Sequence, residues 1–265
     1  MRQRLVHQLW YDPNDANLPP LAQASARSIM ERSDCTLWLW SYRSTSQRAA
    51  HEKDANEILE EATFQKYITA GHKIMHIVDL FRFIALERHG GYWMDSDTIC
   101  LRALPDVKRI FQTIPRRLSG VRVRKQPFFA DPRLGDPANS IFRVPKNDPL
   151  MRYMIAYTVT ALTKSGPIQD TRIVYEWGRK VAEMYPDHLS PPILFCPLPE
   201  NTLPQKESWS KFGWTVPSLF EIKTHSIALD FYGSAKRKFP TKWLKILKVI
   251  DPNLSDMTTN CKEPI

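Results

Sequence analysis

Glycine and cysteine are both scarce in this sequence, with nine and four among 265 residues. Low glycine argues against a repeat or low-complexity array, and the 21 prolines indicate well-formed elements joined by stiff connections. The cysteines lie far apart without a C-x-x-C spacing, which excludes a zinc site or a disulfide framework. We expect separate reduced thiols in a cytosolic protein, at Cys35, Cys100, Cys196 and Cys261.

Long hydrophobic runs are missing as well. No stretch approaches the run of about 18 apolar residues that a membrane span needs. The opening MRQRLVHQLWYDPND carries basic residues but only a very short apolar run, so it does not resemble a signal peptide. We therefore expect a soluble chain whose contact with any membrane is peripheral.

Positive charge is in excess, with a formal net charge of +9. This balance favours an anionic partner: a phosphate-bearing substrate, nucleic acid or a membrane surface. The length of 265 residues favours a single α/β domain with insertions, large enough to bury a hydrophobic core without disulfides or metals.

Strand and helix patterns alternate along the first half of the chain. Short apolar runs predict strands, and apolar residues at three- and four-residue spacing predict helices, so the fold class is α/β with a mostly parallel sheet flanked by helices. Strands are expected at 5–10, 35–40, 92–94, 141–144, 193–196 and 225–231, and helices at 19–31, 54–70, 73–89, 150–163 and 171–185.

The segment HGGYWMDSDTICL, residues 89–101, comes at the end of a strongly amphipathic helix pattern over 73–89. Gly90 is placed to end that helix, after which an aromatic strand leads directly into Asp95 and Asp97. Ligands bind at the carboxyl ends of strands in open α/β sheets. Successive strand residues point to opposite faces, so the two carboxylates can share one ion only if the chain turns at Ser96 or a water intervenes.

Mg²⁺ or Mn²⁺ suits such a pair, because both prefer oxygen ligands and accept diphosphate oxygens in the same shell. A plain acidic turn that closes a strand is the alternative. On the preceding helix, Asp79 and Arg82 share a face among apolar residues, where a charge needs a partner. They either hold a polyhydroxylated ligand or form an ordinary helix-surface ion pair.

The segment VDLFRFIALERHGGYWMDSDTICLRAL resembles the signature of the DXD-containing sugar transferases of glycosyltransferase family 32. The pattern is roughly S-D-x-x-R-x-x-x-L-x-x-x-G-G-x-Y-x-D-x-D. Weaker similarities lie in LVHQLWYDP, TLWLWSY, NSIFRVPKNDPLM, Ser165-Gly166-Pro167 and THSIALDFYGS. The matches to the pattern are Asp79, Arg82, Leu86, Gly90, Gly91, Asp95 and Asp97.

This resemblance implies a GT-A fold and a metal-dependent hexosyltransferase that moves a sugar from a nucleotide donor, most commonly a UDP-sugar, with retention at the anomeric carbon. Mn²⁺ or Mg²⁺ would neutralise the leaving diphosphate. The resemblance offers no agreed protein nucleophile, so no catalytic base is assigned. It implies metal ligands at Asp95, Asp97 and His225, and donor-binding residues at Trp10, Asp79, Arg82, Trp93, Asp95 and Asn139.

The sequence departs from the pattern at three places. Val78 stands where the family usually has Ser, and Trp93 where it usually has Tyr, which suggests an altered sugar pocket. Gly233-Ser234-Ala235 replaces a Ser-Trp pair near the closing histidine. Core packing is the alternative role for Trp10, and a satisfied strand histidine is the alternative for His225.

Two other functions compete with this interpretation. A phosphatase of the haloacid dehalogenase type also ends a strand in D-x-D with Mg²⁺ bound, but it usually carries the pair on its first strand and needs a later acidic motif. A basic nucleic-acid or membrane-binding module would use the lysine- and arginine-rich segments 116–126 and 236–248, which could equally be solvated faces.

We expect a GT-A domain over residues 1–235 and a basic amphipathic helix and tail over 236–265. In TKWLKILKVI, the lysines Lys242, Lys245 and Lys248 alternate with apolar residues, a pattern that can lie in a membrane interface or pack on the domain. The expected acceptor is a lipid-linked glycan, another glycan or a protein, as in polysaccharide biosynthesis. The expected location is cytoplasmic, peripheral at the inner membrane face; a secreted effector is the alternative.

Overall fold

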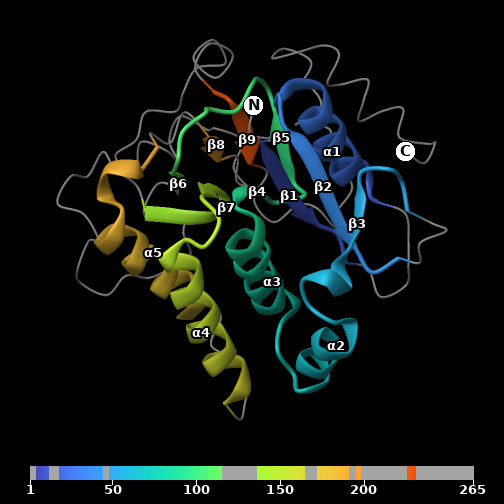
Figure 1. Ribbon diagram of the computed structural model, residues 1–265, viewed down its shortest axis with the longest axis vertical. Helices are drawn as coiled ribbons and strands as arrows, with labels where there is room; N and C mark the ends of the chain where they lie inside the picture. The colour runs from blue at the N-terminus through green and yellow to red at the C-terminus, as the bar shows by residue number, and fades with distance from the viewer. Residues whose placement is uncertain are drawn as a thin grey trace, which may run out of the picture.

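The fold is described from a computed structural model of the chain. It describes residues 4–11, 18–43, 48–114, 136–164, 172–190, 195–197 and 226–230. Within these residues, alternating strands and helices build a mixed α/β structure (Figure 1).

The main sheet has six strands in the order β3-β2-β1-β4-β7-β6 (Figure 1). The first four in this order run parallel to one another, and β7 and β6 are antiparallel to their neighbours. The predicted mostly parallel sheet is therefore correct on one side and gains an antiparallel edge on the other. The strands are β1 (Leu5–Leu9), β2 (Thr36–Ser41), β3 (Glu52–Asp54), β4 (Gly91–Met94), β6 (Ile110–Ile114) and β7 (Asp136–Val144).

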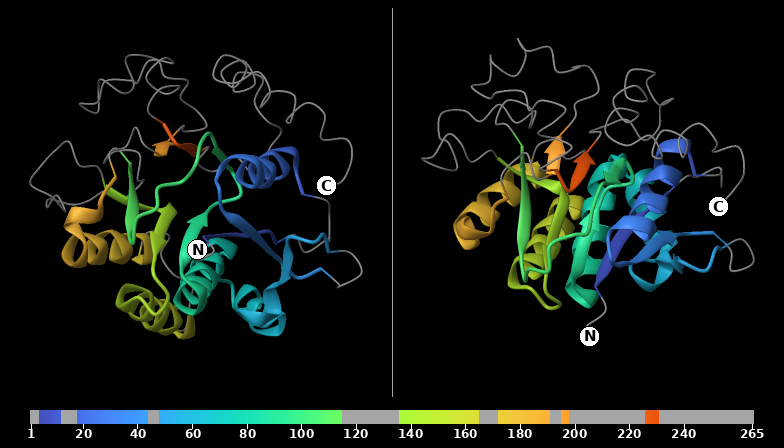
Figure 2. Two further views of the ribbon diagram at one scale, coloured as in Figure 1. Left: turned by 45° about the horizontal axis from the view of Figure 1, so that its top comes forward. Right: turned by 90° about the horizontal axis from the view of Figure 1, so that it is seen from above.

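Helices cover both faces of this sheet (Figure 2). Alternate side chains of β1, β2 and β4 enter two separate cores, as the period of two in a strand requires. Val6, Leu39 and Met94 pack with α1 on one face, whereas Leu9, Trp40 and Trp93 pack with α2 to α5 on the other. The helices are α1 (Pro20–Arg32), α2 (Glu61–Thr69), α3 (Ile74–His89), α4 (Pro149–Thr163) and α5 (Arg172–Met184), with short 3-10 turns η2 (Ala55–Glu57) and η3 (Pro186–His188).

A small second sheet follows the aspartate pair. Its order is β5-β9-β8, with β5 antiparallel and β8 parallel to β9. The helix α1 lies beside β5 in Figure 1, so the strand after the aspartates contacts α1 and pairs with β9. Its strands are β5 (Thr98–Cys100), β8 (Phe195–Pro197) and β9 (Ala228–Asp230).

Two glycines connect α3 to β4. The N–H of Gly90 donates to the carbonyl of Leu86 at 2.8 Å, and its φ of 67° lies in the left-handed region. A Cβ on Gly90 would overlap the backbone of Lys146. Gly91 has φ of 106°, and a Cβ there would come within 2.7 Å of the Leu5 carbonyl oxygen. The chain thus turns sharply out of the helix into the sheet, as the predicted helix end requires.

Most expected elements are present, but one expected helix is too long and three strands were missed. The helix expected over 54–70 is shorter, because Asp54 is the last residue of β3 and pairs with Ser41 of β2. The carboxylate of Asp54 then accepts the N–H of Asn56 at 2.9 Å. That side-chain cap starts η2, and the helix proper begins only at Glu61. The strands β3, β5 and β6 were not predicted.

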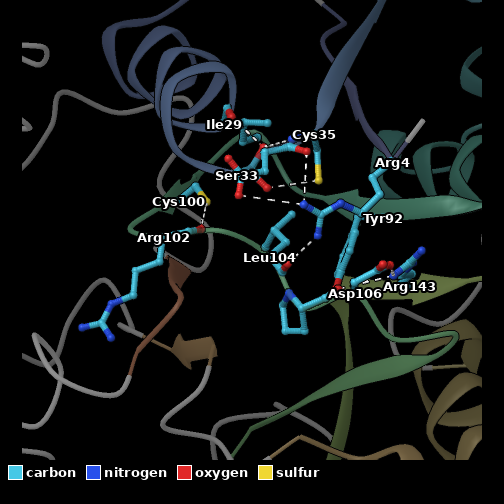
Figure 3. A network of polar contacts seen from close by, with 12 residues as sticks. Arg4, Ile29, Ser33, Cys35, Tyr92, Cys100, Arg102, Leu104, Asp106 and Arg143 are labelled. Atoms are coloured by element: carbon cyan, nitrogen blue, oxygen red, sulfur yellow. Dashed lines mark hydrogen bonds and ion pairs between the residues drawn. The ribbon is translucent and has the colours of Figure 1, made fainter. Parts of the chain in front are cut away.

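The two cysteines whose side chains are described are free thiols, Cys35 and Cys100 (Figure 3). The thiol of Cys35 donates to the Ser33 carbonyl at 3.2 Å, and that of Cys100 to the Arg102 carbonyl at 3.0 Å. Burial raises the pKa of Cys35 and raises that of Cys100 to about 12, so both are protonated at neutral pH. The described cysteines are thus reduced, as predicted; the side chain of Cys196 and all of Cys261 lie outside the described residues.

The predicted C-terminal amphipathic helix, the domain boundary at 235/236 and His225 also lie outside the described residues. Among the helices that the structure describes, none combines the length and apolar character needed to cross a bilayer.

Candidate active site

The aspartate pair lies at the carboxyl end of β4, in the middle of the main sheet (Figure 1). Asp95 is the first residue after the strand, and its N–H donates to the Ser140 carbonyl on β7 at 2.9 Å. The chain then turns at Ser96 and Asp97, and the N–H of Thr98 donates to the Asp95 carbonyl at 3.0 Å. This is the turn that the two carboxylates need in order to reach a common ligand.

Arg82 on α3 connects two of the carboxylates. Its Nη2 lies 3.3 Å from Asp79 Oδ1 and 3.2 Å from Asp95 Oδ1. Asp79 and Arg82 are only 4% and 5% exposed, so the interpretation as a helix-surface ion pair is wrong. The side chain of Asp95 keeps 29% exposure and is therefore the part of this group open to a ligand.

Asn139 joins the group from β7. Its side-chain amide donates to Asp79 Oδ1 at 2.9 Å, and its backbone carbonyl accepts from Arg82 Nη1. The sequence suggested Asn139 only through a weak resemblance. The structure brings it beside Asp79 because β7 pairs with β4, Met94 lying opposite Ile141.

Trp93 keeps a donor where the family pattern has tyrosine. Its indole N–H donates to Asp95 Oδ1 at 2.7 Å. The Arg82 guanidinium carbon lies 5.1 Å from the centroid of the Trp93 ring, a cation–π distance. Since Trp93 is buried, it fixes both partners from the core side of the site.

The carboxylates of this group are crowded in a dry environment. Burial, with the charge of Asp95, raises the pKa of Asp79 to about 6, against the opposing effects of Arg82 and Asn139. Burial also raises the pKa of Asp95, while Arg82, Trp93 and Ser140 lower it. The negative charge is stabilised only in part, so a further cation would stabilise it more.

No metal group is complete within the described residues. Among them, no three His, Cys, Asp or Glu side chains are arranged to hold an ion, and the third predicted ligand, His225, lies outside. The donor set that is described still fits Mg²⁺ or Mn²⁺, which use one or two carboxylates together with phosphate oxygens and water. Two carboxylates and one guanidinium leave negative charge in excess among Asp79, Asp95 and Arg82.

Trp10 directly follows β1 and lies on the face of the sheet that packs against α1. It is partly buried against the α1 core, which agrees with its alternative role as a core aromatic. Its indole nitrogen is nevertheless buried without a hydrogen-bond partner in the described part of the chain, as is Nε of Arg82. Each N–H is a donor that a ligand could satisfy.

Two contacts of the turn were missed by the sequence interpretation. Gln8 Nε2 donates to the Asp95 carbonyl at 3.2 Å, and Ser25 Oγ donates to the Thr98 carbonyl at 2.5 Å. A glutamine in the middle of a buried apolar strand, LVHQLW, was the available signal, because a buried amide requires partners.

A known protein family matches the part of the chain that holds the aspartate turn. Residues 21–115 match the family described as the glycosyltransferase sugar-binding region containing a DXD motif. The matched region contains α3, the turn and four strands of the main sheet, β2, β3, β4 and β6. Residues 21–115 are therefore a DXD-type glycosyltransferase region, and the protein is a glycosyltransferase.

One solved structure, that of a galactosyltransferase, supports a GT-A fold for this glycosyltransferase. The galactosyltransferase LgtC, solved with donor and acceptor sugar analogues, matches with a TM-score of 0.50 at 10% identity, over 98% of this chain and 96% of that chain. PaToxG glycosyltransferase matches with a TM-score of 0.45 at 13% identity, over 68% and 66% of the two chains. Mouse xyloside xylosyltransferase 1 matches with 0.48 at 9% identity, over 89% and 99%.

No curated protein matches the chain by sequence. The predicted fold class and the glycosyltransferase activity are confirmed, and the phosphatase and nucleic-acid alternatives are not favoured. Family 32 membership and the individual residue roles stay predictions.

Proposed function

We propose that this glycosyltransferase binds a nucleotide sugar at the end of β4, with a divalent cation at Asp95 and Asp97. The observation that carries the proposal is the buried group of Asp79, Arg82 and Asn139 around the one carboxylate that stays partly exposed, Asp95. Burying so much charge is costly, and it is most useful where a polar ligand completes the hydrogen bonds.

Different residues of the site would bind the donor sugar, the cation and the diphosphate. Asp79 and the free Nε–H of Arg82 would hold hydroxyl groups of the donor sugar, and Trp93 would keep Asp95 and Arg82 in place. Asp95 and Asp97 would hold the cation, with His225 as the further ligand that the resemblance implies. The bound Mn²⁺ or Mg²⁺ would stabilise the negative charge that develops on the departing diphosphate.

The proposals for the donor and for the stereochemistry of transfer rest on the resemblance to family 32. It favours a UDP-sugar donor and transfer with retention of the anomeric configuration. LgtC, a galactosyltransferase solved with donor and acceptor sugar analogues, is compatible with this class of donor. Trp10 with its free indole N–H would contact the nucleotide base.

The acceptor that we propose is a glycan, lipid-linked or protein-borne, close to an anionic membrane. The support is the net charge of +9 and the lysine-rich pattern of residues 236–248. The enzyme would then lie at the inner face of the membrane and serve polysaccharide biosynthesis. A secreted effector that glycosylates a protein is the second candidate, because the resemblance extends, more distantly, to the clostridial glucosylating toxins.

A double substitution tests the metal site. Asp95→Ala with Asp97→Ala should abolish hydrolysis and transfer of every nucleotide sugar that the wild type uses. A thermal-shift screen of the wild type with nucleotide sugars and Mn²⁺ identifies the donor. Circular dichroism of the double variant should show the wild-type fold, and undiminished turnover in a folded variant would falsify the assignment.

A further inference from the structure

The turn that carries Asp95 and Asp97 is held from its buried side by two polar residues of other elements. We propose that Gln8 on β1 and Ser25 on α1 are positioning residues that fix this turn in the shape needed to bind a cation. The inference rests on the proposed function, because the cation site itself is part of that proposal.

Gln8 acts on the first residue of the turn. The Asp95 carbonyl accepts one hydrogen bond from the Thr98 N–H at 3.0 Å and a second from Gln8 Nε2 at 3.2 Å. A carbonyl oxygen has two lone pairs, so both are used. The first bond is internal to the turn and closes it, whereas the second ties the turn to β1 in the centre of the sheet.

Ser25 acts on the last residue of the turn. Its hydroxyl donates to the Thr98 carbonyl at 2.5 Å and accepts the other N–H of the Gln8 amide at 2.7 Å. Gln8, Ser25 and Thr98 are all fully buried. The two side chains therefore form one connected clamp that holds both ends of the segment 95–98, with Asp97 between them.

The chemistry of the partners fixes the orientation of the Gln8 amide. The Asp95 carbonyl can only accept, so the amide nitrogen must face it, and the amide oxygen then points elsewhere. That oxygen is buried without a hydrogen-bond partner among the described residues, which costs free energy. An apolar side chain of equal length would avoid this cost.

Stability alone is therefore a weak reason for a glutamine at this place. Without Gln8, the Asp95 carbonyl would keep the Thr98 N–H, and Ser25 would keep the Thr98 carbonyl. No buried group of the turn would lose its last partner. What would be lost is the bond between the turn and β1, so that only the Asp95 N–H, bonded to the Ser140 carbonyl, would still tie the turn to the sheet by a backbone hydrogen bond. The placement of the two carboxylates would then be less fixed.

Gln23 offers a matched control on α1. Like Gln8 it is a buried glutamine whose Nε2 donates to a backbone carbonyl, that of Leu18 at 2.6 Å, and whose Oε1 has no partner in the described part of the chain. It does not contact the turn in any described hydrogen bond. Gln8→Met and Gln23→Met remove the same chemical groups from two buried sites.

Mn²⁺ binding to the full chain, followed by electron paramagnetic resonance of the free ion, tests the proposal without any activity assay. We expect the dissociation constant for Mn²⁺ to rise about tenfold in Gln8→Met and to stay at the wild-type value in Gln23→Met. Equal dissociation constants in the two variants would overturn the inference. A wild type that binds no Mn²⁺ would instead contradict the proposed metal site.

Amide hydrogen exchange provides the second readout and needs no metal. The Thr98 N–H should exchange at least tenfold faster in Gln8→Met than in Gln23→Met, because the turn loses its hydrogen bond to β1. Ser25→Ala, a smaller change in case Gln8→Met does not fold, should show the same acceleration and weaker Mn²⁺ binding. Wild-type exchange at Thr98 in both Gln8→Met and Ser25→Ala would show that neither side chain restrains the turn.

Discussion

Arg82 makes more contacts in the site than any simple ion pair would need. One guanidinium reaches Asp79, Asp95 and the carbonyl of Asn139 while it lies over the Trp93 ring. Only a planar fork with several N–H groups can do this, and lysine offers a single compact charge. The shape of the side chain, as well as its charge, is therefore part of the proposed site.

We predict that Arg82→Lys lowers nucleotide-sugar turnover by about a hundredfold, the usual effect of removing a positioned donor. Arg109→Lys is the control, since Arg109 pairs with the buried Asp148 at 2.7 Å and lies 4.6 Å from the Tyr185 ring, away from the turn. The melting temperature should fall by a similar amount in both variants. An equal loss of turnover in the control would mean that Arg82 serves stability alone.

His7 is a buried histidine whose protonation state the structure determines. Its Nδ1 accepts the indole N–H of Trp40 at 3.1 Å, so Nε2 carries the proton and donates to the Gly90 carbonyl at 2.9 Å. Burial, reinforced by the charge of His89 and opposed by the Gly90 bond, lowers the pKa of His7 to about 4. A protonated ring would lose its bond from Trp40.

This histidine makes stability depend on pH. The unfolded chain takes up a proton near pH 6.5 and the folded chain only near 4, so the contribution is complete above 6.5 and is lost as pH falls toward 4. The loss should reach about 3 kcal/mol in the free energy of unfolding. His7→Gln keeps one donor and one acceptor without titrating, and urea unfolding should show a flatter pH dependence for it. Parallel curves for the two proteins would contradict the assignment.

At the scale of elements, the α3–β4 junction is where the fold allows least change. Gly90 has left-handed φ and also lies against the backbone of Lys146, whereas Gly71 has φ of 86° with no atom within 4 Å of an added Cβ. A side chain added at either glycine would strain the backbone, but only at Gly90 would it also overlap neighbouring atoms. The pair separates conformational strain from steric overlap.

We predict that Gly90→Ala lowers the free energy of unfolding by about 3 kcal/mol or more, the sum of strain and overpacking. Gly71→Ala should lower it by about 1–2 kcal/mol, from strain alone. Urea denaturation of both variants measures the difference. If the two losses are equal, the close approach of β4 and residue 146 does not limit the junction.

At the scale of the whole molecule, the charge of +9 predicts an anionic surface as a partner. We predict that the full chain floats with liposomes containing anionic lipid at low salt and stays at the bottom at high salt, since basic residues contribute about 1 kcal/mol each near such a surface. Changing Lys242, Lys245 and Lys248 to Glu should abolish flotation.

Three exposed lysines elsewhere provide the matched control for charge. Changing Lys66, Lys108 and Lys146 to Glu alters the net charge by the same amount on other surfaces. This variant should still float. Equal loss of flotation in both triple variants would assign the attraction to net charge and not to the C-terminal segment.

The sequence by itself determined the local features of this protein. The apolar stripe of residues 73–89 and Gly90 predicted α3 and its end, because helix periodicity and left-handed backbone depend on neighbours in the chain. The same spacing put Asp79 and Arg82 on one helix face ahead of Asp95 and Asp97. Family resemblance then predicted the fold class and the glycosyltransferase activity.

Only the tertiary structure decided which distant groups complete the site. Asn139 lies 60 residues from Asp79, and Gln8 lies 87 residues from Asp95. Their contacts follow from the strand order and from the antiparallel pairing of β7 with β4, which the burial of two cores selects. Local patterns carry no information about such pairing, because it depends on packing energy summed over the whole sheet.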